Sequence, residues 1–359
     1  MKFTSKMMRL TQSVTSVALV LLAGALSSCI EQLPQTHYSN PYESVHPFME
    51  GIYAADQEPV QAHQQRVRGV VVPHHLVSSE AMARGIHALK RQGITRIVLL
   101  SPDHFDACGN VLCTTRGSYD TSLGKVKLTA PVTLAASSLV TLQPELFQAE
   151  HGIHAVLPFI AHALPEAEVT AVVMKADFSW KTSKEAVLDL LLPLFDDETA
   201  FVVSSDFSHY LTLPRANLKD EETMEVFLAK DMDGIAALEN PAQSDCPGCL
   251  WLIASAMEHL HAFNPSILAH TNAATILGDP KAKETTSHFA IAFYENAELS
   301  SEDIAFAGDL TFTRGIPRMP TAEALAFWSG SGTRVINLEG PLAKVCLGHA
   351  NIFIFCNSY

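Results

Sequence analysis

Short apolar runs alternate with longer amphipathic segments through the middle of the chain. The apolar runs have the length of buried strands and lie at residues 67–73, 95–102, 168–174 and 199–205. The segments between them space their apolar residues as helices do and lie at residues 78–93, 151–164 and 183–195. Strands that are apolar almost throughout are typical of a sheet covered on both faces. The alternation therefore predicts an α/β fold, a mainly parallel sheet sandwiched by helices.

The pattern changes twice toward the C-terminus. Residues 216–262 look largely helical, and two late strands at 267–277 and 285–295 complete one domain, residues 67–296. A strand pattern restarts at residues 302–315 and again at 333–342. Residues 300–359 therefore look like the opening of a second domain, and the alternative is a C-terminal hairpin packed on the main body.

The N-terminus has the layout of a secretory signal. Three basic residues precede an apolar stretch at residues 14–26, which is too short for a comfortable membrane span, and "LSSC" follows, ending at Cys29. "LSSC" resembles a bacterial lipobox, so we expect a lipoprotein signal peptide at residues 1–28 and a lipid on Cys29. The product would be exported and anchored to a bacterial membrane, on its periplasmic or cell-surface side. A plain signal peptide or an uncleaved anchor is the alternative.

Residues 29–66 are rich in Gln, His, Pro, Tyr and Ser without periodicity, which predicts a tether between the lipid and the folded body. Hydrophobic residues make up 48% of the chain and charged residues 17%, so a disordered protein is excluded. The formal net charge of −14 argues against nucleic acid as a partner.

The cysteines other than Cys29 form an even set, which in an exported protein suggests disulfides. The most plausible pairs are Cys108 with Cys113 and Cys346 with Cys356, although the sequence does not fix the pairing.

Polar residues with histidines follow three of the predicted strands. They are His74 and His75, then Asp103 and His104, then Asp206 and His209. Because the carboxyl ends of parallel strands share one edge of a sheet, the three histidine clusters can converge there. Neutral imidazoles are good ligands for Fe, Cu and Zn, and Asp103 and Asp206 are candidates to hold the rings. Solvated loops or helix caps are the alternative.

Two further groups stand at predicted helix starts. Glu150, His151 and His154 could face the same cleft or simply cap their helix. Cys246 and Cys249 form a C-x-x-C spacing before an apolar helix, where a thiol has a lowered pKa that favours metal ligation or redox exchange. A local disulfide or two ordinary half-buried thiols are the rival interpretations.

An ordered series of motifs over residues 65–296 resembles the Memo family, also called AmmeMemoRadiSam system protein B. The motifs are "VVVPHH", "VLLSPDHF", "EHGIHAVLPF", "VVSSDFSHY", "SDCPGC" and "HTNAATILGD" followed by "TTSHFAIAFY". The resemblance implies a fold similar to class III extradiol dioxygenases, which hold Fe(II) with two His and one carboxylate.

Carried over by position, the resemblance implies His74 and His104 as metal ligands and Cys246 as the third, where the dioxygenases have a Glu. It places His209 as an acid/base group, with Asp206 beside it in the catalytic set. Asp103, Glu150, His151 and Cys249 would support the metal or contact a substrate. The chain departs from the family pattern after the first ligand, where Ala-Gly-Tyr is replaced by His75, Leu76 and Val77.

The last segment has a separate resemblance, to the capsule synthesis protein CapA family with its metallophosphatase-like fold. "IAFAGDLTFTRG" and "VINLEGPL" are similar to the first two motifs of that family, which implies Asp309, Asn337 and Glu339 as metal-binding residues. Because the later histidine motifs are missing from the sequence, we expect a truncated, inactive remnant.

These observations predict an exported Memo-like protein that binds a redox metal, Fe or Cu, in a His/His/Cys cleft, with an oxidative or metal-handling role. One alternative is a class III extradiol-type dioxygenase. The other is a non-enzymatic module whose vestigial cleft binds a peptide or small-molecule ligand, which the sequence does not identify.

Overall fold

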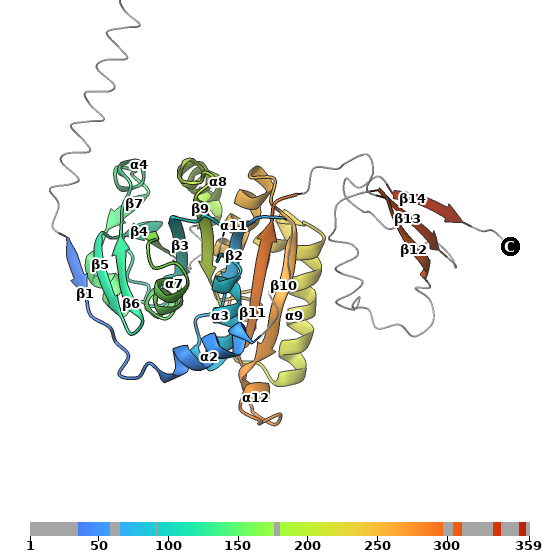
Figure 1. Ribbon diagram of the computed structural model, residues 1–359, viewed down its shortest axis with the longest axis horizontal. Helices are drawn as coiled ribbons and strands as arrows, with labels where there is room; N and C mark the ends of the chain where they lie inside the picture. Colours follow the sequence, from blue (N-terminus) through green and yellow to red (C-terminus); the bar gives the residue numbers. More distant parts are fainter. Residues whose placement is uncertain are drawn as a thin grey trace, which may run out of the picture.

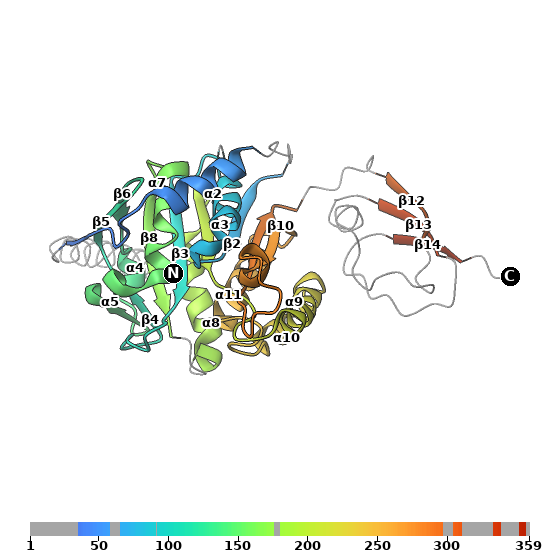
Figure 2. The same cartoon turned by 90° about the horizontal axis from the view of Figure 1, so that it is seen from below.

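The computed structural model describes residues 35–57, 65–90, 92–175 and 180–296, with three later strands described by their backbone. Its main sheet is built around β2 (Val67–Val72), β3 (Arg96–Pro102), β8 (Glu168–Met174) and β9 (Thr199–Ser204). These strands lie in the order β8-β3-β9-β2 and pair in parallel; β3, β9 and β2 are labelled in Figure 1, and β8 is labelled beside β3 in Figure 2. The predicted α/β fold with a mainly parallel sheet is confirmed.

Other strands widen this sheet on both sides. Beyond β2, the antiparallel strands β11 (Ser287–Tyr294) and β10 (Pro265–Asn272) complete one edge. Beyond β8 lie β6 (Gly124–Leu128), β5 (Gly117–Thr121) and β1 (Thr36–Tyr38), while β4 (Leu112–Thr114) pairs with both β8 and β7 (Val140–Leu142).

Side chains of the central strands alternate between two buried cores. In β2, Val70 and Val72 join one core and Val71 joins the other. In β3, Leu99 belongs to the first core and Leu100 to the second. Successive residues of a strand point to opposite faces, so a strand that is apolar at every position can be buried only when helices cover both faces.

Two groups of helices provide that cover, as Figure 2 shows. The first face carries α2 (His46–Asp56), α3 (Ser79–His87) and α7 (Leu157–Ala163). The second carries α8 (Trp180–Leu191), α9 (Leu213–Leu228), α10 (Met232–Ala236) and α11 (Pro247–His259). Shorter elements are η1 (Leu76–Ser78), α4 (Val132–Ala135), α5 (Pro144–Ala149), α6 (His151–His154), η2 (Leu192–Leu194) and α12 (Ala273–Ile276).

The helix predicted at residues 151–164 is two helices, α6 and α7. Pro158 lies in the first turn of α7, where its missing N–H and its ring interrupt a continuous helix. The break leaves His151 on a short helix of its own at the edge of the sheet. None of the helices within the described ranges has the length and apolar character needed to cross a membrane.

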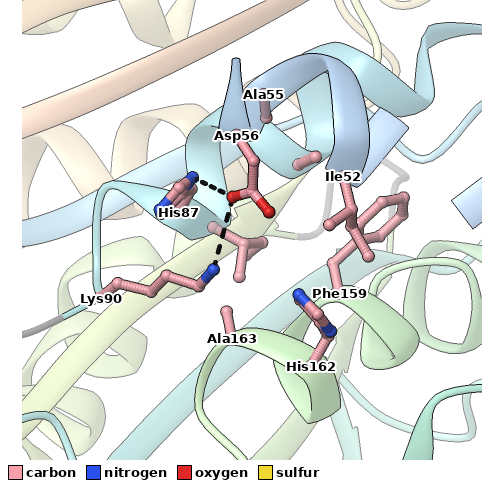
Figure 3. Close-up of a pocket in the computed structure, with 10 residues that line it drawn as sticks. Ile52, Ala55, Asp56, His87, Lys90, Phe159, His162 and Ala163 are labelled. Carbon is pink, nitrogen blue, oxygen red and sulfur yellow. Dashed lines mark ion pairs between the residues drawn. The ribbon is translucent and has the colours of Figure 1, made fainter. Parts of the chain in front are cut away.

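The tether prediction for residues 29–66 is wrong where the structure describes that segment. β1 pairs in parallel with β5, and α2 packs on α3 with Phe48 fully buried. Asp56 at the end of α2 makes ion pairs with His87 (3.3 Å) and Lys90 (3.7 Å) beside a small pocket (Figure 3). A Cβ on Gly51 would lie 2.5 Å from the Ser79 backbone, so a glycine is needed where the two helices touch.

Three strands of the C-terminal segment form a separate sheet: β12 (Ile304–Leu310), β13 (Thr333–Leu338) and β14 (Ile352–Cys356). They pair in parallel, so β12 and β13 are not the hairpin that was the alternative. Asp309 lies on β12 and Asn337 on β13, and the structure describes only the backbone of these two residues. Glu339, Cys346 and the N-terminal segment through residue 34, including Cys29, also lie outside them.

Candidate metal centre

The three strand ends that carry polar residues lie side by side, as the sequence predicted, but His209 is not in any of the groups of potential ligands that the described side chains form. β9 lies between β3 and β2 and pairs in parallel with both. The residues that follow these strands, His104, His74 and Asp206, therefore emerge at the same edge of the sheet. His74 and Asp206 are buried there, with 4% and 2% of their surface exposed.

Glu150 fixes the ring of His104. It is fully buried and caps α6, where its Oε1 accepts a hydrogen bond from the backbone N–H of Gly152 (2.9 Å). Oε1 also accepts from Nδ1 of His104 (2.6 Å), and Oε2 accepts from the His104 backbone N–H (3.1 Å). An ionised carboxylate only accepts, so Nδ1 carries the hydrogen of this bond and Nε2 faces Asp245 on the other side of the ring.

His74 is held by groups on and just after the neighbouring strand β9. Its Nδ1 lies 3.0 Å from the hydroxyl of Ser204, and its backbone N–H donates to Oδ1 of Asp206 (3.2 Å). Nε2 then lies 3.2 Å from Oδ2 of Asp245 and 3.6 Å from Oδ2 of Asp206. The second histidine therefore also presents Nε2 to carboxylates at the sheet edge.

Asp245 is the residue that sequence reasoning missed. Its Oδ1 accepts from the hydroxyl of Ser205 (2.6 Å) and its Oδ2 accepts from the backbone N–H of Asp206 (3.1 Å). The same Oδ2 lies 3.6 Å from Nε2 of His104 as well as 3.2 Å from Nε2 of His74. The available signal was its place in "SDCPGC", one position before the cysteine that the family resemblance selected.

Cys246 does not supply the predicted thiolate in this structure. Cys246 and Cys249 form a disulfide, and Cys246 caps the N-terminus of α11. A disulfide sulfur has no thiolate charge, so the structure does not support the predicted His/His/Cys set; the carboxylate of Asp245 is the group that lies within 4 Å of the Nε2 atoms of both histidines. A second disulfide joins Cys108 and Cys113, which confirms that predicted pair.

His151, at the start of α6, joins the buried His74 and the partly exposed His104. Its ring centroid lies 3.9 Å from that of His104 and 5.0 Å from that of His74. Three groups of described side chains bring ligand atoms within 4.8 Å of one another. They are His74, His104 and His151; His74, Asp206 and Asp245; and His75, Asp206 and His288.

The other predicted site residues have different roles. The carboxylate of Asp103 accepts from the backbone N–H groups of Phe105 (3.2 Å) and Cys108 (2.6 Å), so it shapes the loop after β3 rather than holding an imidazole. His209 donates from Nδ1 to the carbonyl of Phe207, which leaves Nε2 as the basic nitrogen.

Burial and neighbouring charge have opposite effects on the pKa values of His104 and His74 but act together on that of His151. Burial would lower the pKa of His104, but hydrogen bonds to Asp245 and Glu150 and the charges of both raise it to about 10. Burial likewise opposes charging of His74, but the charges of Asp206 and Asp245 raise its pKa. Burial and the charges of His104 and His74 lower the pKa of His151 to about 4.

The pKa values of the two aspartates at this centre are lowered. Burial would raise the pKa of Asp245, but the charge of His74 and hydrogen bonds from His104 and His74 lower it. Burial would also raise the pKa of Asp206, yet the charges of His74 and His288 lower it. The centre therefore keeps buried carboxylates ionised by placing positive charge beside them, which a divalent cation also does.

A mainly parallel α/β sheet with histidines and carboxylates gathered at its carboxyl edge defines a protein with a potential metal centre. The sequence profile of the Memo-like protein family matches residues 35–285, and the chain belongs to this family. The match also begins inside the segment for which a tether was predicted.

Relatives of this chain include a MEMO1 family protein of Methanothermobacter thermautotrophicus, 24% identical over 49% of this chain and 66% of that protein. A MEMO1 family protein of Methanopyrus kandleri is 28% identical over 46% and 62%. The match thus spans less than two thirds of either relative. A third, from Pyrobaculum aerophilum, is 24% identical over 63% and 83%. An uncharacterized protein of Escherichia coli K12 is similar in structure, with a TM-score of 0.41 and 15% identity over 63% of this chain and 99% of that one.

Proposed function

We propose that this Memo-like protein binds a divalent redox metal, Fe(II) in preference to Cu, and uses it in an oxidative reaction. His74, His104 and Asp245 would hold the ion. The observation that carries the proposal is the position of Asp245 Oδ2, 3.2 Å and 3.6 Å from the Nε2 atoms of the two histidines.

These separations fit donors of one ion. Nitrogen and oxygen ligands lie about 2.0–2.2 Å from a first-row metal such as zinc, so two ligands of the same ion are roughly 3–4 Å apart. Both Nδ1 atoms have hydrogen-bond partners, Ser204 for His74 and Glu150 for His104. Such partners orient ligating histidines and select the tautomer that binds through Nε2.

The identity of the third donor favours iron. A thiolate would suit Cu(I), whereas two imidazoles and a carboxylate are the facial set of non-haem Fe(II) oxygenases. This observation also favours the extradiol-type dioxygenase as a second candidate function. A bound Fe(II) would supply the chemistry with O₂.

His209 is the group that could move a proton. Its Nδ1–H is held by the Phe207 carbonyl, so Nε2 is free to accept a proton from a substrate hydroxyl. Asp206 holds the backbone of His74 and would position that ligand rather than react itself.

Export and a lipid anchor on Cys29 remain part of the proposal. The disulfides Cys108–Cys113 and Cys246–Cys249 support it, because disulfides persist in oxidising compartments outside the cytoplasm. Labelling cells with a radioactive fatty acid tests the anchor. We expect the label on the wild-type chain and its loss from Cys29→Ala, and an unlabelled wild type would contradict it.

Elemental analysis of the purified full chain after anaerobic incubation with Fe(II) tests the metal centre. We expect at least one iron per chain, reduced by one in His74→Ala/His104→Ala and unchanged in His46→Ala, whose side chain is 82% exposed. No bound iron in the wild type would mean that the polar strand ends serve structure or ligand binding, and the enzyme proposal would fail.

A turnover assay separates the enzyme from a binding module. The iron-loaded chain is mixed with catechol in air, and ring opening is followed by the absorbance of the product. Extradiol-type activity should be lost in Asp245→Asn. Iron binding without turnover of any catechol tested would favour metal handling or the non-enzymatic module.

A further inference from the structure

A second cluster of potential ligands lies on the other side of Asp206. Oδ2 of Asp206 faces His74 at 3.6 Å, while its Oδ1 lies 3.2 Å from Nδ1 of His288. The ring of His75 is 5.5 Å from that of His288 and nearly edge-on to it. Asp206 therefore stands between the centre described above and a pair of histidines that the proposed function does not use.

His288 has one nitrogen without a partner. It lies in the interior at 0% exposure, at the start of β11, and its Nε2 has no hydrogen-bond partner among the described residues. Because the Asp206 carboxylate only accepts, it accepts a hydrogen bond from Nδ1–H of His288, and in the neutral imidazole the other nitrogen, Nε2, then has an unshared electron pair. Buried polar atoms without a hydrogen-bond partner are rare in folded proteins, and a bound ion is one explanation for such an atom.

We propose that His288 and His75 hold a second divalent metal ion, with Asp206 as the carboxylate shared between the two centres. This inference rests on the proposed function, because Asp206 also orders the first centre. A carboxylate that receives Nδ1–H of an imidazole while Nε2 binds a metal is a recurrent arrangement in metal sites. Two imidazoles beside a carboxylate suit a first-row divalent ion.

The exposure of the two histidines fits such a site. His288 is anchored inside the protein, while His75 is exposed at the end of β2. The buried histidine would fix the position of the ion, and the exposed one would close over it from solvent.

Cobalt binding by the full chain tests the proposal. The protein is dialysed against excess Co(II), and bound cobalt is measured by elemental analysis and by its visible absorption. We expect two cobalt ions per chain for the wild type and one for each of His288→Asn and His75→Ala. The asparagine amide can replace Nδ1–H toward Asp206 but offers nothing in place of Nε2, so it removes the ligand while keeping the hydrogen bond.

Control variants separate the possible outcomes. His46→Ala, an exposed histidine on α2, should bind two ions like the wild type. One ion in the wild type that persists in His288→Asn and His75→Ala would overturn the second site and leave the first standing. Two ions in all of these proteins would also overturn it, and no ion in the wild type would overturn both proposals. Should His288→Asn fail to fold, the exposed His75→Ala decides.

Discussion

Oδ2 of Asp245 lies 3.2 Å from Nε2 of His74, and the same oxygen is 3.6 Å from Nε2 of His104. Asp245 is the residue immediately before Cys246, which is held in a disulfide with Cys249. The carboxylate thus takes the place that the thiolate was predicted to fill.

Replacing this carboxylate should abolish most of the metal affinity. We expect Asp245→Asn to weaken Fe(II) binding by about 100-fold or more. Loss of a residue that only supports a ligand costs about 10–100-fold in metal affinity, and loss of a ligand should cost at least as much. Anaerobic titration with Fe(II) measures the change. The matched variant Cys246→Ser/Cys249→Ser should keep its iron, and loss of iron in that variant alone would show that sulfur is the ligand.

Glu150 should matter through His104. We expect Glu150→Gln to reduce Fe(II) affinity by about 10–100-fold, because the charged partner of the ligand's Nδ1 is removed. The same titration serves, with Glu145→Gln on the exposed side of α5 as the control. Equal affinities of the two variants would mean that Glu150 only caps its helix.

The metal-free protein should lose stability as the pH rises above neutrality. The pKa of His104 is about 10 in the folded chain, against an ordinary value of 6.5. The folded state therefore binds more protons than the unfolded state between these values, and the free energy of unfolding falls as pH rises through this window. Urea unfolding at pH 6.5 to 10 after chelator treatment measures the slope, which Glu150→Gln should reduce. A free energy of unfolding that stays constant over this pH range would contradict the charge pairing of His104 with Asp245 and Glu150.

Gly152 should tolerate no side chain. A Cβ there would lie 2.1 Å from Oγ of Ser101, so alanine must push α6 from β3 and move His151. We expect Gly152→Ala to cost about 1–3 kcal/mol in urea unfolding, as overpacking usually does. Gly109→Ala, whose Cβ meets only ordinary contact at 3.6 Å, should be nearly neutral. Equal stability of the two variants would refute the close packing.

The helix found where a tether was predicted should contribute to stability. Phe48 of α2 is fully buried, so Phe48→Ala should lower the free energy of unfolding by about 3–5 kcal/mol. Met49, its neighbour, is 42% exposed, and Met49→Ala should change little. Urea unfolding compares the two, and a silent Phe48→Ala would restore the tether interpretation.

The central sheet could be predicted because a strand buried on both faces is apolar at nearly every position. Strands β2, β3 and β9 are apolar at nearly every position, and the polar residues begin where each strand leaves the core. His74 and His104 could be selected for the same reason. The hydrophobic pattern of α2 is weaker, because Gly51 and Ala55 make up half of its buried positions and are only slightly hydrophobic.

The remaining site residues depend on three-dimensional contacts. Asp245 and Cys246 are adjacent, and the contacts that set them apart are three-dimensional: Ser205 and Asp206 hold the Asp245 carboxylate, while Cys246 forms a disulfide with Cys249. His288 lies within a strand that reads as ordinary core, and its contact with Asp206 spans 82 residues of sequence. Pairings over such separations leave no periodic signal.

The pairing of β1 with β5 limits how this protein could sit on a surface. Thr36 begins β1, only seven residues after Cys29. Even a fully stretched chain of seven residues reaches at most about 25 Å. A lipid on Cys29 would therefore keep the β1 edge of the sheet within about 25 Å of the bilayer surface.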